Sequence, residues 1–327
     1  MDTPVKKRWI IALRVAIGIA LFLLVMTRVD LREMAELLRH AHLPSLVGVV
    51  LLFFCLFLVK TLRWQYLLGL NALALPFPRA LYMYIVSCLM GFVTPGRLGE
   101  MIRIVPPAKE NGRYVDSTAC MAVDKAYDIA LFAILLCAGA LAATLPTTLR
   151  WIGGGLGVLI ILGLAIGFVL VRGWVKRGAP IPDKIIGALP KTWQTFMAEK
   201  PANFFRVSYV TALRSWLAGP VLTILFWIVH VACHYMMLRS LGKSMDLGYF
   251  IMCLILVSLV EFVPITISGL GTREVLFVYL FEPAGLSSEE AFAFASLNLF
   301  LMYIVTSVFV LCLWPISRRT EESAHDR

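Results

Sequence analysis

The sequence predicts an all-α polytopic membrane protein, with about six spanning helices and two oppositely oriented re-entrant helical hairpins that form an inverted repeat. The first observation behind this prediction is composition, since 60% of the 327 residues are hydrophobic and only 15% are charged. The mean hydropathy of +0.84 is too high for a soluble domain. The second observation is a pair of interrupted apolar regions with similar sequences, and the third is the distribution of positive charge between the apolar segments.

Six uninterrupted apolar stretches are long enough to cross about 30 Å of hydrocarbon at about 1.5 Å per residue. They lie near residues 9–27, 44–60, 117–144, 151–172, 208–238 and 288–314. The first stretch follows three basic residues, as in a secretory signal, but no small-residue cleavage site comes after it. We therefore expect it to be an uncleaved first helix.

Two further apolar regions, 80–106 and 247–283, are interrupted by helix-breaking residues. Both interruptions begin with Phe-Val and then contain a Pro, two Gly, an Arg and a final Glu, and they read FVTPGRLGE (92–100) and FVPITISGLGTRE (262–274). Pro95 and Pro264 are the expected helix breaks. Each remaining arm has about 10 to 17 residues, which is short for a full crossing. We therefore expect re-entrant hairpins, although charge counting also allows arms that cross fully.

Positive charge indicates the orientation of the chain. With the N-terminus in the cytoplasm, the inside segments 1–8, 60–79, 97–113, 172–206 and 315–327 hold 20 Lys and Arg, and the outside segments hold 6. This distribution predicts a multi-pass protein of the plasma (inner) membrane with both termini cytoplasmic. The net charge of +10 collects beside apolar segments, so no nucleic-acid partner is expected.

The same layout predicts how the chain is organised. The first hairpin begins and ends inside and the second begins and ends outside, so three spans and a hairpin are repeated upside down. We expect a single transmembrane domain over 1–327, with a first repeat at 1–145 and a second at 151–314. Residues 172–206 are expected to form a cytoplasmic basic loop.

The two interruptions contain candidate anion-binding groups. A helix start offers unpaired N–H groups and a positive dipole end, and arginine adds fork-shaped donors that suit phosphate oxygens. The candidate substrate-binding residues are Arg97, Arg103, Arg273, Gly96, Ser268, Gly269, Gly271 and Thr272. The alternative is an internal set of salt bridges that only pins the hairpins.

Five carboxylates are candidates for a charge network or for proton coupling: Glu100, Asp124, Asp128, Glu261 and Glu274. Asp124 and Asp128 are one helical turn apart and share a face. No neighbouring motif supplies the further oxygen ligands that a metal pair needs, so a network around Arg97 and Arg103 is expected instead. No metal, cofactor or catalytic residue is predicted.

Three motifs give the chain a family resemblance. PGRLGE-x-x-R (95–103), the charged pair Asp124-Lys125 followed by Asp128, and P-x-x-x-S-G-L-G-T-R-E (264–274) resemble the flippase-like family that includes the transmembrane region of lysylphosphatidylglycerol synthase, the multiple peptide resistance factor. The resemblance runs over about 10–314. It implies movement of lipids or lipid-linked molecules between leaflets. Family members often have Glu-Arg at 124–125, and the aminoacyl-transferase domain of the synthase is missing from this chain, so lysylation by the chain alone is not expected.

These observations together predict a lipid transporter that is not an enzyme. It would move an anionic phospholipid or a polyprenyl-phosphate-linked lipid, with the headgroup held by arginines at two facing helix breaks. One alternative is a membrane-embedded enzyme acting on lipid phosphates, which would have to combine Ser268 with His230 or His234. Another is a membrane subunit that partners a separate lipid-modifying enzyme. The lipid, the direction, the driving force and the oligomeric state are left open.

Overall fold

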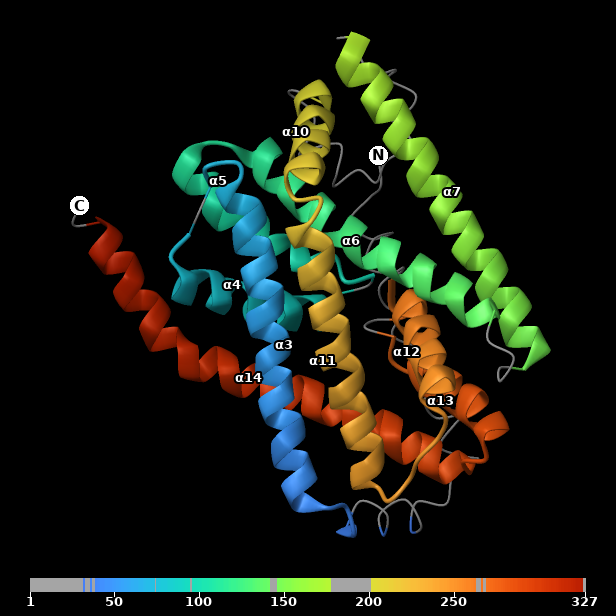
Figure 1. The fold of residues 1–327 in the computed structure, drawn as a ribbon. Helices are drawn as coiled ribbons and strands as arrows, with labels where there is room; N and C mark the ends of the chain where they lie inside the picture. Colours follow the sequence, from blue (N-terminus) through green and yellow to red (C-terminus); the bar gives the residue numbers. More distant parts are fainter. Residues whose placement is uncertain are drawn as a thin grey trace, which may run out of the picture. The chain divides into compact units, whose positions relative to one another are not determined.

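A computed structural model describes residues 32, 36, 39–73, 75–94, 96–141, 146–177, 201–262, 266 and 269–325. The described chain is all α-helical, as predicted (Figure 1). Its α-helices are α3 (Leu43–Gly69), α4 (Phe77–Phe92), α5 (Val105–Asn111), α6 (Tyr114–Leu141), α7 (Thr147–Arg177), α10 (Pro201–Arg214), α11 (Ala218–Ser240), α12 (Leu247–Phe262), α13 (Thr272–Phe281) and α14 (Ser288–His325). Two short 3-10 helices, η1 (Leu98–Ile104) and η2 (Glu282–Ala284), complete the described elements.

Four described helices are long and apolar enough to cross a membrane, which identifies a membrane protein. They include the stretches Leu43–Gly69, Thr147–Lys176, Ala218–Ser240 and Ser288–Pro315. Helix α6 (Tyr114–Leu141) corresponds to the predicted span 117–144 but is not among the four, because it carries four charged residues (Asp116, Asp124, Lys125 and Asp128). The predicted first span, 9–27, lies outside the described residues.

Two predicted span boundaries are wrong. The stretch 208–238 is divided, since α10 ends at Arg214 and α11 begins at Ala218. Pro220 explains the division, because it has no N–H for the carbonyl of Trp216. Helix α3 continues to Gly69, so Lys60 and Arg63 lie inside a helix that extends beyond the span end expected at residue 60.

Both interrupted regions contain a helix break at the predicted place. The first break separates α4 from η1, and the second separates α12 from α13. Helices α4 and α12 have 16 residues each and α13 has 10. At about 1.5 Å per residue each is about 24 Å long or shorter, less than the hydrocarbon thickness. Re-entry into the membrane and the inverted repeat remain predictions.

The chain forms two compact units, each with segments from both predicted repeats. Unit 1 comprises 1–56, 85–100 and 228–315, and unit 2 comprises 57–84, 101–227 and 316–327. Helices α3 and α11 each pass from one unit into the other. Of the predicted basic loop, residues 178–200 lie outside the described part.

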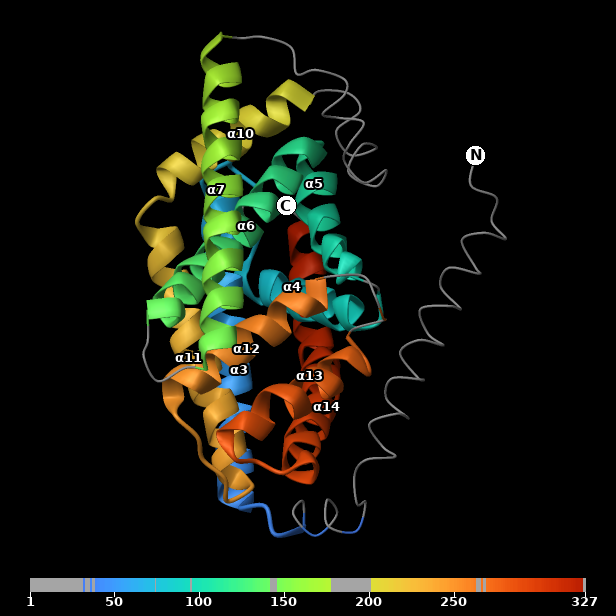
Figure 2. The same ribbon diagram turned by 90° about the vertical axis from the view of Figure 1, so that its right-hand side faces the viewer.

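An aromatic core connects α12, α13 and α14 within unit 1. Phe250, Phe277, Phe281 and Phe294 lie with ring centroids 5.2 to 6.1 Å apart. The Tyr249 hydroxyl donates a hydrogen bond of 2.6 Å to the carbonyl of Leu280, and Figure 2 shows α12 beside α13. This packing fixes the two helices that flank the second break.

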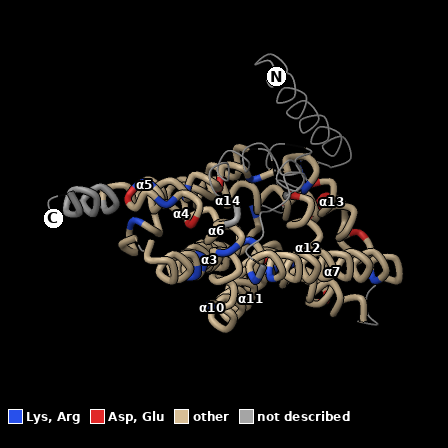
Figure 3. Tube along the Cα trace, turned by 90° about the horizontal axis from the view of Figure 1, so that it is seen from above, with Lys and Arg blue, Asp and Glu red and all other residues tan. Residues whose placement is uncertain are grey.

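Helices α6 and α7 pack closely against each other in unit 2. A Cβ added at Gly157 of α7 would lie 2.8 Å from the carbonyl oxygen of Ala133, so this close approach needs glycine. The charged residues of α7 lie near its two ends, and Figure 3 shows the middle of the helix without charged residues. Such a pattern is typical of a helix that spans hydrocarbon.

Candidate functional site

The first helix break turns the chain through two consecutive residues with left-handed backbone. Gly96 has φ +60° and Arg97 has φ +55°. A non-glycine residue in this region costs of order 1–3 kcal/mol and persists only where the surrounding structure imposes it. The arginine is therefore held in a fixed place at the break. Pro95 lies outside the described residues.

A tight contact behind Arg97 supports this turn. The Thr94 hydroxyl donates to the carbonyl of Met90 at 2.9 Å and accepts the N–H of Gly99 at 2.6 Å. A Cβ on Gly99 would lie only 2.1 Å from the Met90 carbonyl oxygen, so no larger residue fits there. The start of η1 is thus pressed against the end of α4.

The second break has the same character. Gly269 and Gly271 have φ +72° and +77°. The Glu274 carboxylate accepts the N–H of Gly271 at 2.6 Å, and the Thr272 hydroxyl donates to the carbonyl of Gly269 at 2.9 Å. Glu274 therefore satisfies a backbone donor at the start of α13. Pro264 and Ser268 lie outside the described residues.

Arginines from the two breaks meet at one carboxylate, that of Glu261 near the end of α12. Arg97 donates from Nη2 to Glu261 Oε2, and Arg273 Nη1 lies 3.7 Å from Glu261 Oε1. Arg97 Nη1 also lies 3.7 Å from Glu100 Oε1. All these residues belong to unit 1. We call Arg97, Glu100, Glu261, Arg273 and Glu274 the break cluster.

Arg273 is the most deeply buried cation of the break cluster. Its side chain is 1% exposed, and Nη2 donates to Glu274 Oε1 at 2.9 Å. Its Nε and Nη1 atoms are buried and have no hydrogen-bond acceptor among the residues that the structure describes. A buried donor left unsatisfied costs about 1–3 kcal/mol. These N–H groups are consequently available to the oxygens of an anion.

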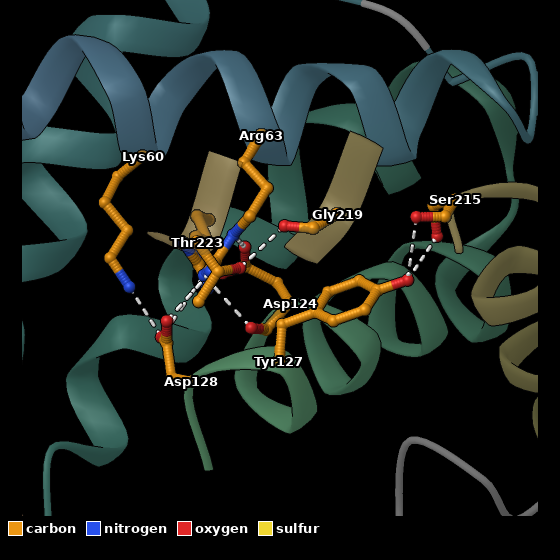
Figure 4. A network of polar contacts seen from close by, with 9 residues as sticks. Lys60, Arg63, Asp124, Tyr127, Asp128, Ser215, Gly219 and Thr223 are labelled. Carbon is orange, nitrogen blue, oxygen red and sulfur yellow. Dashed lines mark hydrogen bonds and ion pairs between the residues drawn. The ribbon is translucent and has the colours of Figure 1, made fainter. Parts of the chain in front are cut away.

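A second group of buried charges lies in unit 2, around Arg63 of α3 (Figure 4). Nε of Arg63 donates to Asp124 Oδ1 at 2.7 Å, and Nη1 donates to Asp128 Oδ1 at 2.8 Å and to the Thr223 hydroxyl at 2.7 Å. Nη2 donates to the Asp124 carbonyl at 3.0 Å and to Asp128 Oδ2 at 3.2 Å. A guanidinium has five N–H donors, so every donor of Arg63 has an acceptor.

Two more cations contact the aspartates that pair with Arg63. Lys60 Nζ donates to Asp128 Oδ2 at 2.5 Å and lies 3.9 Å from the ring centroid of Phe226. Arg103 Nη2 donates to Asp124 Oδ2 at 2.7 Å. We call Lys60, Arg63, Arg103, Asp124 and Asp128 the aspartate network.

The structure divides the predicted charge network between the two units. Arg103 pairs with Asp124 of unit 2, whereas the ion pairs of Arg97 include Glu100 and Glu261 of unit 1. Lys60 and Arg63 were missed, because charged residues were assumed to end the second span. The sequence signal that indicates them is the pattern Lys60-x-x-Arg63 in an apolar segment, together with two aspartates on one face of α6 that can pair with it.

The histidine pair of the enzyme alternative lies on α11. The rings of His230 and His234 have centroids 4.1 Å apart, and Nδ1 of His234 donates to the carbonyl of His230 at 2.8 Å. Nδ1 of His234 is therefore engaged with the backbone of its own helix.

Comparison with known families agrees with the motifs at the two breaks. Residues 11–309 match the family model described as the lysylphosphatidylglycerol synthase TM region. Neither the curated proteins nor the solved structures contain a match to this chain. The matched range covers most of the sequence, including both breaks and the aspartate network. The chain therefore belongs to the lysylphosphatidylglycerol synthase TM region family.

Proposed function

We propose that this chain is a flippase-type lipid transporter, which moves an anionic phospholipid or a polyprenyl-phosphate-linked lipid between leaflets without altering it chemically. The observation that carries the proposal is Arg273, a buried guanidinium at a helix break with two nitrogen atoms that lack an acceptor. Family membership supports a lipid-related role in the membrane. We place the chain in the plasma (inner) membrane with both termini in the cytoplasm, as the positive charges predict.

In this proposal the headgroup phosphate binds between Arg97 and Arg273. Both guanidinium groups already contact Glu261, and the break cluster holds two arginines and three glutamates. An anionic headgroup has to compete with Glu261 for the arginines. The competition supports transport, because a phosphate that replaces a carboxylate is released again when the carboxylate returns. Arg103 lies in unit 2, and its part in headgroup binding stays a prediction.

The experiment measures lipid movement in proteoliposomes. Fluorescent phosphatidylglycerol is placed in both leaflets, and a membrane-impermeant quencher then reports the rate at which inner-leaflet lipid becomes accessible. Arg273→Ala is expected to reduce this rate to the level of empty vesicles. Arg239→Ala, which removes an exposed arginine of the same unit, is expected to keep the wild-type rate.

A second variant separates loss of function from loss of fold. Arg273→Lys keeps the positive charge but lacks the fork of N–H donors, so intermediate transport is expected from a protein that still elutes as one species. Unchanged transport in Arg273→Ala would overturn the proposed site. Release of phosphate, or a lipid of changed mass recovered from the vesicles, would favour the enzyme alternative.

A further inference from the structure

Lys60 is not needed to satisfy the carboxylate it contacts. Both oxygens of Asp128 already accept hydrogen bonds from Arg63, at 2.8 and 3.2 Å. The ammonium of Lys60 is therefore a second cation on a carboxylate that is already paired. Charged side chains within membrane helices are costly, and those that occur usually mark a substrate or ion path.

The ammonium has donors left for another acceptor. It carries three N–H bonds, of which one is donated to Asp128 Oδ2 within the described part of the chain, while the ring of Phe226 covers another side. Arg63, in contrast, has given all five donors to groups of the protein. A ligand that reaches this part of unit 2 can be bound by Lys60 and not by Arg63.

The exposed fractions of the side chains also favour Lys60 as the residue that can bind a ligand. The side chain of Lys60 is 12% exposed, whereas those of Arg63 and Asp124 are at most 1% exposed and that of Asp128 is 6% exposed. In Figure 4, Lys60 lies at the edge of the group and Ser215 at the opposite side. Lys60 is thus more exposed than Arg63, Asp124 and Asp128, and it retains donor capacity.

We propose that Lys60 is an anion site of unit 2, which binds a phosphate oxygen of a lipid headgroup while Arg63 and the two aspartates hold its surroundings rigid. The choice of a lipid rests on the proposed function, because free inorganic phosphate offers the same oxygens. The site is additional to the break cluster of unit 1. An ammonium is a point charge that can donate a hydrogen bond to an oxygen approaching from many directions, so the site recognises the charge and not the shape of the headgroup.

The test measures lipid binding to the purified full chain in phosphatidylcholine nanodiscs, with phosphatidylglycerol as the probe. Lys60→Gln is expected to weaken phosphatidylglycerol binding about tenfold, and Lys60→Arg to keep it within about threefold. Lys176→Gln is the matched control: it removes the same charge from an exposed position of unit 2 and should leave binding unchanged. Equal binding in Lys60→Gln and wild type, or equal losses in Lys60→Gln and Lys176→Gln, would overturn the site.

A second arm identifies the source of the anion. Inorganic phosphate that displaces phosphatidylglycerol from wild type but not from Lys60→Gln would support a general phosphate site. Lys60-dependent lipid binding that inorganic phosphate does not affect would support a site restricted to lipids. Because Asp128 keeps Arg63 in the variant, the thermal midpoint of Lys60→Gln in pure phosphatidylcholine should stay within about 4 °C of wild type.

The binding assay and the transport assay can refute the anion site and the proposed function independently of each other. If Lys60 controls binding but no variant or wild-type protein moves lipid, the proposed function is wrong and the anion site remains. If wild type moves lipid and Lys60→Gln binds it equally well, the proposed function remains and the anion site is wrong.

Discussion

Arg63 in unit 2 and Arg273 in unit 1 are both buried, yet their surroundings differ in a way that separates structure from function. Each of the five donors of Arg63 meets a carboxylate, a carbonyl or a hydroxyl. Arg273 makes one short ion pair, to Glu274 at 2.9 Å, and keeps two nitrogen atoms without an acceptor. A guanidinium with all its donors used stabilises the protein, whereas one with donors left over can bind a ligand.

The backbone around the two arginines also differs, because one lies in a continuous helix and the other at a helix break. Arg63 lies within the continuous helix α3, which has 27 residues. Arg273 lies in the first turn of α13, directly after Gly269 and Gly271 in left-handed backbone. A continuous helix satisfies its own backbone groups, but a break exposes donors that a ligand can use. The comparison predicts that Arg63 variants lose stability and Arg273 variants lose activity.

Arg63→Met should damage the protein more than any other substitution that the comparison suggests. It removes a cation from two buried aspartates, and breaking a buried ion pair costs about 3–5 kcal/mol. We expect little folded protein, measured as the yield of the monodisperse peak in size-exclusion chromatography and as the thermal midpoint. Arg172→Met, at an exposed position of the same unit, is the control and should change neither. Wild-type yield and midpoint for Arg63→Met would contradict the structural role.

Gly99→Ala should have the second largest effect, because it attacks the packing behind Arg97. The added Cβ would lie 2.1 Å from the Met90 carbonyl oxygen, so the backbone has to move at a cost of about 1–3 kcal/mol. We expect a lower thermal midpoint together with slower lipid transport. Gly163→Ala on α7 meets no atom within 4 Å and should be neutral or slightly stabilising. Equal midpoints for the two variants would contradict this packing.

The helix breaks could be predicted from the sequence because their cause is local. Proline lacks an N–H, and glycine permits left-handed backbone, so two motifs that combine both residues with charge predict interruptions at Pro95-Gly96 and around Pro264 to Gly271. In the structure α4 ends at Phe92 and α12 ends at Phe262. The all-helical membrane class could be predicted as well, since it follows from composition. The meeting of Arg97 with Glu261 depends on how distant segments pack, and no spacing in the sequence expresses it.

Arg63 could not be identified from local rules, because the rules favour ending a span at its first charged residue. In the protein, α3 continues past Lys60 and Arg63, since Asp124 and Asp128 of α6 offset their charge. Pro220 has the opposite effect on 208–238, since the apolar run predicts one helix and the proline divides it into α10 and α11. Hydropathy therefore misplaces helix ends wherever tertiary charge pairs or a proline decide them.

Glu261→Gln should have a moderate effect at the break cluster, where it removes the charge that Arg97 and Arg273 share. The amide no longer competes as an anion for Arg97 and Arg273, so phosphatidylglycerol should bind about tenfold more tightly, which is about 1.4 kcal/mol. Transport should slow at the same time, because the lipid is released less readily. Nanodisc binding and the proteoliposome assay measure the two effects. Glu110→Gln, which changes an exposed glutamate of unit 2, is the control. Weaker binding in Glu261→Gln would contradict competition for the arginines.

Thr223→Val should have the smallest effect and tests whether all five donors of Arg63 matter. Valine has nearly the shape of threonine but no oxygen, so one N–H of Arg63 loses its acceptor and comes to resemble the unpaired groups of Arg273. The expected cost is about 1–2 kcal/mol. Thr118→Val is the matched control, because Thr118 is buried in the same unit and also donates to the carbonyl four residues earlier, at 2.8 Å, as Thr223 does at 2.7 Å. If both variants lower the thermal midpoint equally, the hydrogen bond from Arg63 to Thr223 contributes nothing, and donor saturation does not explain the stability of the aspartate network.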